Sequence, residues 1–300
     1  MTTAVLATTP EALGEEIAAR RPWYVRLRSE PAAIVGGVII LIVGFCAIFA
    51  PWLAPHDPNL QDLSRVTMPP MWMHGGNSSF PLGTDNLGRC VLSRILFGAR
   101  VSSLVGLSVV AIGGTIGVTA GMVAGYFGGL VDEVIARITD LQLAFPFLLL
   151  AVAIVAVIGP SLGTVIIVLG VTSWVQYVRV VRAETLSSRE REYVIAASAT
   201  GASRPRILLR HILPNIASAV IVLATFEVAR TVILESALSF LGLGAPPTIP
   251  SWGSMLADGR QYIDTAWWLE TFPGMAIMLA VLGVNLFGDG LRDVVDPHAH

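Results

Sequence analysis

Six long apolar stretches constrain the fold of this 300-residue chain more than any other feature of its sequence. A helix needs about 20 apolar residues to cross the ~30 Å hydrocarbon core of a bilayer. Lipid cannot hydrogen-bond free backbone groups, so these stretches are expected to be helices rather than open strands. The stretches are residues 32–53, 101–126, 134–158, 162–181, 216–241 and 272–291. The sequence therefore predicts an all-α integral membrane protein with six transmembrane helices.

The composition excludes a soluble globule and several kinds of chemistry. Charged residues make up only 13% of the chain, whereas soluble domains are about a quarter charged. The net charge of −2 gives no general attraction to nucleic acid. All 19 basic residues are Arg, and a phosphate-binding loop of the GxxxxGK[ST] type needs a Lys. The chain is therefore expected to hold no ATP in that way and to use no lysine nucleophile.

The distribution of arginine predicts the orientation, because cytoplasmic segments of membrane proteins carry an excess of basic residues. Arginines cluster before the first stretch, between the fourth and fifth, and after the sixth. They are Arg20, Arg21, Arg26 and Arg28, then Arg182, Arg189, Arg191, Arg204, Arg206 and Arg210, and finally Arg292. With six spans all three groups fall on one side, so both termini are expected in the cytoplasm. The first stretch is too long for a signal-peptide core and is interpreted as a retained anchor.

The same pattern divides the chain into segments. We expect a cytoplasmic tail over residues 1–31, a first transmembrane helix over 32–54, and an outer loop with an interfacial helix over 55–100. A five-helix core over 101–296 follows and includes an inner loop at 183–215. A second cytoplasmic tail covers 297–300. The interfacial helix is predicted because Arg89, Arg94 and Arg100 interleave with apolar residues. Cys46 and Cys90 differ in expected membrane depth and are predicted to be unpaired.

Glycines recur every four residues in the second apolar stretch, at Gly113, Gly117, Gly121, Gly125 and Gly129. Small residues at this spacing line one helix face and let a neighbouring backbone approach closely. Tight helix packing is the favoured interpretation. A sliding surface for an alternating-access motion is the alternative.

A few polar residues fall inside the predicted spans, where burial of charge is costly and such groups face a partner or a wet cavity. The candidates are Asp140, Glu227, Arg230, Glu235 and Asn285. Glu227 and Arg230 are three residues apart and can pair on one helix face. Asp140 is followed by Pro146, which should kink its helix. Ion pairs that fix helix packing are the favoured interpretation, and contact with a solute or a proton relay is the alternative.

The inner loop contains a distinctive order of small residues and prolines. It runs Ala196-Ala197-x-x-x-Gly201, with Pro205 and Pro214 further along. This order predicts a short helix of small residues, a break at the glycine, a second short helix that opens at Pro205, and a stop at Pro214. Such a pair would project a small, knob-like crown that fits a groove on another protein.

The residue order from Ala196 to Pro214 resembles the coupling-loop signature of binding-protein-dependent ABC importer permeases. Ile195 and His211 depart from it, since many members have Glu and Ile there. Residues 81–89, 97–100, 210–215, 235–244 and 288–293 resemble the dipeptide, oligopeptide and nickel branch. The long outer loop resembles that of its C-type subunit. Cys90 stands where this branch usually has Asp after Gly-Arg.

This resemblance implies the type I ABC importer permease fold with a cytoplasmic coupling helix pair, in the bacterial plasma (inner) membrane. It implies import of di- or oligopeptides by alternating access. The implied partners are a homologous B-type permease subunit, one or two cytoplasmic ABC ATPase subunits that hold ATP and Mg, an extracytoplasmic solute-binding protein, and membrane lipid. The implied ATPase-coupling residues are Ala196, Ala197, Gly201, Ala202, Pro205, Arg206, His211 and Pro214. No catalytic, metal or cofactor site is implied in this chain.

Two other classes compete with this interpretation. An ion-coupled secondary transporter would use Asp140 or Glu235 as its coupling site and would transport solute without ATPase partners. The inverted repeats typical of that class are not evident in the sequence. A membrane enzyme is disfavoured because the chain contains no GxSxG or HExxH motif.

Overall fold

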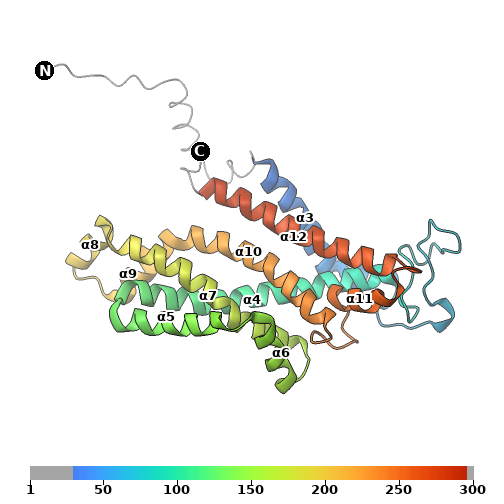
Figure 1. The fold of residues 1–300 in the computed structure, drawn as a ribbon. Helices are drawn as coiled ribbons and strands as arrows, with labels where there is room; N and C mark the ends of the chain where they lie inside the picture. Colours follow the sequence, from blue (N-terminus) through green and yellow to red (C-terminus); the bar gives the residue numbers. More distant parts are fainter. Residues whose placement is uncertain (1–29, 296–300) are drawn as a thin grey trace, which may run out of the picture.

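The computed structural model describes residues 30–295, and Figure 1 shows them as an elongated bundle of helices. The α-helices are α3 (Pro31–Leu53), α4 (Val91–Phe127), α5 (Gly129–Ala144), α6 (Phe147–Ile158), α7 (Leu162–Arg189), α8 (Glu192–Ala199), α9 (Arg204–Ile207), α10 (Leu213–Phe240), α11 (Trp252–Gly259) and α12 (Trp268–Val295). Within this range the only β-structure is an isolated bridge between Thr84 and Cys90. The all-α prediction is confirmed. The predicted tails at 1–31 and 297–300 lie almost wholly outside the described residues.

Five helices are long and apolar enough to cross a membrane, and the bent pair α5–α6 makes a sixth span. The five are α3, α4, α7, α10 with its N-terminal extension α9, and α12. Five of the six predicted spans are therefore confirmed as long apolar helices, and the third corresponds to the bent pair. In Figure 1, α8 and α9 lie at one end of the bundle, and α11 with the long loops lies at the other.

The third predicted span is broken rather than kinked. A single helix over 134–158 was expected, but α5 and α6 meet at an angle of 85°. The break falls at Phe145, whose backbone is extended, with φ −93° and ψ 126°. Pro146 supplies the cause, because proline lacks an N–H and forces the preceding residue out of the helical region.

The amphipathic segment expected to lead into the second span is continuous with that span. Helix α4 runs without interruption for 37 residues from Val91, since no proline falls within it. At about 1.5 Å per residue it is ~55 Å long, well beyond the ~30 Å of bilayer hydrocarbon. Its first turns therefore extend out of the apolar layer, and Arg94 lies buried there rather than among lipid headgroups.

Helices α4 and α7 pack closely through the row of glycines. A Cβ atom added at Gly117 would lie 2.5 Å from the carbonyl oxygen of Trp174, and one at Gly125 would lie 2.8 Å from that of Arg182. Gly113 and Gly121 meet the same helix. Backbones this close leave no room for side chains. Gly129 is not part of this contact, because it opens α5 with φ +56° and has open space around it.

Pro214 does not stop a helix, contrary to the expectation from sequence. Residues 204–240 form one continuous span that includes a π-turn at Leu208–Ile212, in which the Leu213 N–H donates to the Leu208 carbonyl. The wider π-turn relieves the clash that proline makes with the preceding turn of an α-helix. The second short helix thus joins the fifth span directly.

Substitution of Gly117 should separate α4 from α7. We expect Gly117→Ala to lower the free energy of unfolding by about 1–3 kcal/mol, the usual cost of overpacking, when measured by thermal unfolding in detergent. Gly114→Ala is the matched control, because its Cβ would meet Tyr177 Cε1 at 3.6 Å, an ordinary contact. Equal effects of the two substitutions would contradict the proposed close approach.

Candidate functional site: the inner loop, the intramembrane polar groups and the outer cap

The inner loop folds around a glycine-dependent turn. Gly201 follows α8 with φ +82°, a backbone conformation that favours glycine. The Ala202 N–H donates to the Ala197 carbonyl at 3.1 Å, and the Gly201 N–H donates to the Ser198 carbonyl at 3.0 Å. These two bonds form a Schellman motif, which satisfies the last carbonyls of α8. The chain then reverses into α9, as the sequence predicted.

The turn creates a cavity of about 460 Å³ between α8 and the helix that follows it. The cavity is lined by Tyr193, Ala196, Ala197, Thr200, Ala202, Arg206, Arg210 and His211. Five of the eight predicted coupling residues are in that set. Gly201 lies at the exposed tip, while Pro205 and Pro214 are exposed elsewhere on the loop. Small side chains on one wall and cationic ones on the other could receive a partner with an acidic or polar projection.

Sequence reasoning missed Tyr193, Thr200 and Arg210 in this cavity. A signal for them was present, because Tyr193 and Thr200 lie one helical turn on either side of the Ala196–Ala197 pair. Arg210 similarly lies one turn after Arg206. The family pattern consists of the small residues and does not include their neighbours on the same helix face.

The inner loop is fixed to the membrane helices by a shared apolar cluster. Val194 of α8 and Ile207 of α9 pack with Met122 of α4, Val181 of α7 and Ile216 of α10. All of these side chains are at most 4% exposed. The loop is therefore not a free hairpin, and a displacement of α8 must displace the inner ends of three spans.

Polar contacts reinforce this attachment. The Arg189 guanidinium donates to the Gly125 carbonyl at 3.1 Å, and that of Arg204 lies 5.5 Å from the ring centroid of Phe127. Arg182 of α7 pairs with Asp132 of α5. The inner ends of α4, α5 and α7 are thus held to one another and to the loop.

The predicted intramembrane polar residues do not form one site. Asp140 is exposed on α5 and Asn285 is part-buried on α12, and these helices lie on opposite sides of the bundle in Figure 1. The Glu227–Arg230 pair is present, with Arg230 Nη1 3.3 Å from Glu227 Oε1. A second pair on α5, between Glu133 and Arg137, is loose and solvent-exposed, at 3.9 Å.

Glu235 is held by serines in the interior of the bundle. Its side chain is buried, with 1% of the residue exposed. Ser239 donates to Glu235 Oε1 at 2.8 Å, and Ser102 of α4 lies 3.4 Å from Oε2. These hydrogen bonds connect α10 to α4, which favours a structural role for this residue over the ion-coupling role considered above.

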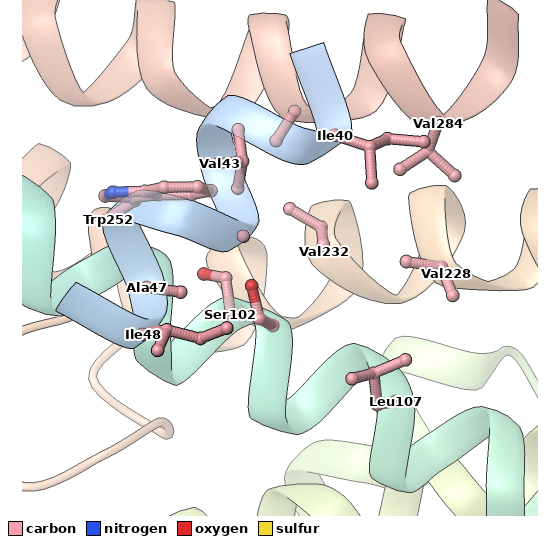
Figure 2. A pocket seen from close by; sticks show the side chains of 13 residues that line it. Ile40, Val43, Ala47, Ile48, Ser102, Leu107, Val228, Val232, Trp252 and Val284 are labelled. Atoms are coloured by element: carbon pink, nitrogen blue, oxygen red, sulfur yellow. The ribbon is translucent and has the colours of Figure 1, made fainter. Parts of the chain in front are cut away.

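A cavity of about 260 Å³ lies between α3, α4, α10 and α12 (Figure 2). All but two of its thirteen lining residues are apolar, the exceptions being Ser102 and Ser103. The indole of Trp252 closes one side of it, and its Nε1 donates to the Ile95 carbonyl at 3.0 Å. This lining offers almost no polar group to orient a charged solute.

The outer loop is a structured cap on the bundle, fixed by a buried charge cluster. Asp85 accepts a hydrogen bond from Arg89 Nε at 2.7 Å and another from Arg94 Nη1. Both guanidiniums also reach Asp258 of α11, at 3.1 and 3.3 Å. The side chains of Asp85, Arg89 and Arg94 are at most 6% exposed. The cluster joins the outer loop, the start of α4 and α11 into one unit.

No cluster of His, Cys, Asp or Glu suited to a metal ion occurs within residues 30–295. Cys46 and Cys90 are unpaired.

Comparison with known proteins identifies the family. The family described as "Binding-protein-dependent transport system inner membrane component" matches residues 117–300, and the "N-terminal TM domain of oligopeptide transport permease C" matches residues 20–70. The chain belongs to the binding-protein-dependent ABC import permeases. Within them it falls in the dipeptide and oligopeptide branch, as a C-type subunit.

Curated relatives match this permease over nearly their full length. The "Di/tripeptide transport system permease protein DppC" of Pseudomonas aeruginosa is 45% identical over 88% of each chain. The "Dipeptide transport system permease protein DppC" of Escherichia coli K12 is 46% identical over 92% of this chain and 91% of its own. These relatives do not support the secondary-transporter alternative.

A solved structure supports the fold. One chain of the MetNI methionine ABC transporter in an inward-facing conformation aligns with a TM-score of 0.55 over 67% of this permease and 96% of its own length, at 18% identity. The type I ABC importer permease fold that the resemblance implied is thereby confirmed. The apolar helices and the family membership make this permease a multi-pass protein of the inner membrane.

Removal of the charge on Asp85 should destabilise the outer cap. We expect Asp85→Asn to lower the free energy of unfolding by about 3–5 kcal/mol, because two buried guanidiniums lose their main counter-charge. Asp258→Asn is the control, and it should lose about 0–1 kcal/mol because the Asp258 side chain is 38% exposed and screened by solvent. Chemical unfolding in detergent measures both. A larger loss for Asp258→Asn would contradict this assignment.

Proposed function

We propose that this permease is one membrane subunit of an ATP-driven importer of di- or oligopeptides. Family membership carries the importer part of the proposal. The cargo is supported by relatives named for dipeptide or di/tripeptide transport that match this chain at 45–46% identity. The observation that best supports coupling to an ATPase is the exposed cavity at the inner end, which is lined by the guanidiniums of Arg206 and Arg210 and by the imidazole of His211.

The inner loop is the docking surface for a cytoplasmic ATPase subunit in this proposal. Two large apolar side chains on it face solvent, Ile195 at 57% and Leu209 at 61% exposure. Exposed apolar groups beside a cationic cavity are typical of a protein contact surface rather than of a free loop. ATP and Mg²⁺ would be held by that ATPase, in agreement with the absence of lysine from this chain.

The coupling works by rigid-body movement in this proposal. Closure of the ATPase pair displaces α8 and α9, and the apolar cluster around Val194 and Ile207 carries that displacement to α4, α7 and α10. The bundle then exchanges between inward- and outward-facing states. No covalent step occurs in this chain.

The two ends of the bundle suggest where the other proposed partners bind. Because the inner loop and the outer cap lie at opposite ends of the bundle (Figure 1), an extracytoplasmic solute-binding protein would dock on the cap. A homologous B-type subunit would complete the path. In this proposal both termini are in the cytoplasm, which is supported by the arginine distribution and by an even number of spans.

Reconstitution tests the proposed function. Proteoliposomes that contain this permease, its B-type partner, the ATPases and the binding protein should accumulate dialanine only when ATP is supplied. Omission of the ATPases should abolish uptake. Uphill transport by this chain without them would contradict the proposal.

Substitution of Gly201 tests the docking surface. Gly201→Asp should insert normally but uncouple ATP hydrolysis from uptake, because it adds bulk and charge at the tip of the loop. Gly242→Asp is the matched control. Both glycines have positive φ, +82° and +76°, and open space for a side chain. The two substitutions therefore impose similar backbone strain, and they differ in that only Gly201 lies in the inner loop. Normal ATP-driven uptake by Gly201→Asp would refute docking at this tip.

A further inference from the structure

Another cavity, of about 250 Å³, lies at the break between α5 and α6. Unlike the apolar cavity beside α3, it has four polar side chains in its lining, from three helices. They are Gln142 of α5, Thr172 and Gln176 of α7, and Arg230 of α10. The helix break itself supplies Phe145 and Pro146 to the wall.

The backbone at this break requires a polar environment. Helix α5 ends at Ala144 and α6 resumes at Phe147, and no side chain caps the first N–H groups of α6. Non-helical backbone at membrane depth is tolerated only where it is buried in protein or lines a water-filled cavity. Phe145 and Pro146 line a cavity with polar walls, which can satisfy the free backbone groups of the break.

Part of the polar wall is rigid. The Trp174 Nε1–H donates to Gln142 Oε1 at 2.7 Å, and Gln142 Nε2 donates to the Thr172 carbonyl at 2.8 Å. Both ends of the Gln142 amide are therefore engaged, and they fix the end of α5 to α7. Gln176 and Arg230 are the lining groups with hydrogen-bonding capacity to spare.

Arg230 and Glu227 form an asymmetric pair. The Glu227 side chain is 7% exposed, whereas that of Arg230 is 43% exposed. Both contacts between them use the same nitrogen, Arg230 Nη1, at 3.3 and 3.4 Å. A guanidinium has five donors, and a purely structural pair would typically engage two nitrogens in a fork. Within the part of the chain that the structure describes, Nε and Nη2 of Arg230 have no partner.

We propose that Arg230 binds the carboxylate of the solute as it passes through this cavity, with Gln176 beside it as a second polar contact. The proposal rests on the proposed function, and it identifies the C-terminal carboxylate as the group that is recognised. The uncapped N-terminus of α6 adds positive potential at the same place. Every linear peptide carries this carboxylate whatever its side chains, so one contact would serve peptides of different sequence.

The arrangement of Glu227 and Arg230 suits weak, transient binding of a solute rather than tight binding. A transport site must bind well enough to admit the solute and weakly enough to release it. Glu227 weakens the attraction between Arg230 and the solute carboxylate, because the Glu227 carboxylate already pairs with the same guanidinium. The site offers one cation, partly neutralised, in a cavity with polar walls.

Cysteine protection tests this contact without the binding protein. Gln176→Cys is introduced into the assembled complex with its ATPases and B-type partner, and thiol labelling at position 176 is followed by mass spectrometry without nucleotide. We expect dialanine to slow labelling several-fold and its C-terminal amide to have no effect. The double substitution Glu227→Gln with Arg230→Gln should abolish protection, although it leaves no unpaired charge. Neutralisation of the exposed Glu133–Arg137 pair is the control and should preserve protection.

Several outcomes would overturn the proposal. Three results would each show that the guanidinium does not bind the carboxylate. They are equal protection by the dialanine amide, no protection by dialanine, and full protection in the doubly neutral variant. If the doubly neutral variant fails to assemble, the exchanged pair Glu227→Arg with Arg230→Glu keeps an ion pair but places a carboxylate at the cavity. That variant should also lose protection, and its retention of protection would refute the contact. Failure of the wild-type complex to import dialanine would instead refute the proposed function.

Discussion

Close packing of α4 against α7 is the contact on which the rest of the structure depends. Helix α4 runs the whole length of the bundle, and the glycines at 113, 117, 121 and 125 fix it to α7. The outer charge cluster begins at its first turn, Glu235 is attached to it through Ser102, and Met122 enters the cluster beneath the inner loop. A displacement at the cytoplasmic end can therefore reach the outer cap through one rigid helix, whereas bulkier residues in the α4–α7 contact would loosen that connection.

The buried charges divide into two kinds. Asp85, Arg89 and Arg94 are nearly inaccessible and mutually paired, as expected of groups that hold elements together. Arg230 is different, because its partner is buried while its own side chain is 43% exposed beside a cavity. The guanidinium of a half-exposed arginine beside a cavity keeps N–H groups free, and in our proposal these bind the anionic group of the solute. All of these residues form ion pairs, so pairing alone does not distinguish them. The exposed fraction of the side chain does, because the structural arginines are buried and Arg230 is not.

Local sequence signals predicted part of this structure. The spans follow from hydropathy, and the turn at Gly201 follows from its residue order, because each depends on residues close in the chain. Pro146 indicated a break, but the 85° angle depends on where α6 packs and could not be predicted. Pro214 was misjudged because the compensating π-turn is not encoded in any simple pattern. Arg94 was assigned to the headgroups because its partner Asp258 lies 164 residues away along the chain.

The outer cluster also accounts for the departure at position 90. Cys90 lies one helical turn before Arg94, and its side chain is buried where this branch usually has Asp. A carboxylate at that spacing would accept from Arg94, as residues four apart on a helix do. In this chain Arg94 Nε is buried without a hydrogen-bond partner, while Asp85 and Asp258 satisfy Nη1. Cys90 supplies no carboxylate here, so the counter-charges of Arg94 are Asp85 and, more weakly, Asp258 of α11. The start of α4 is therefore connected to α11, the outer helix that precedes α12, through Arg94 and Asp258.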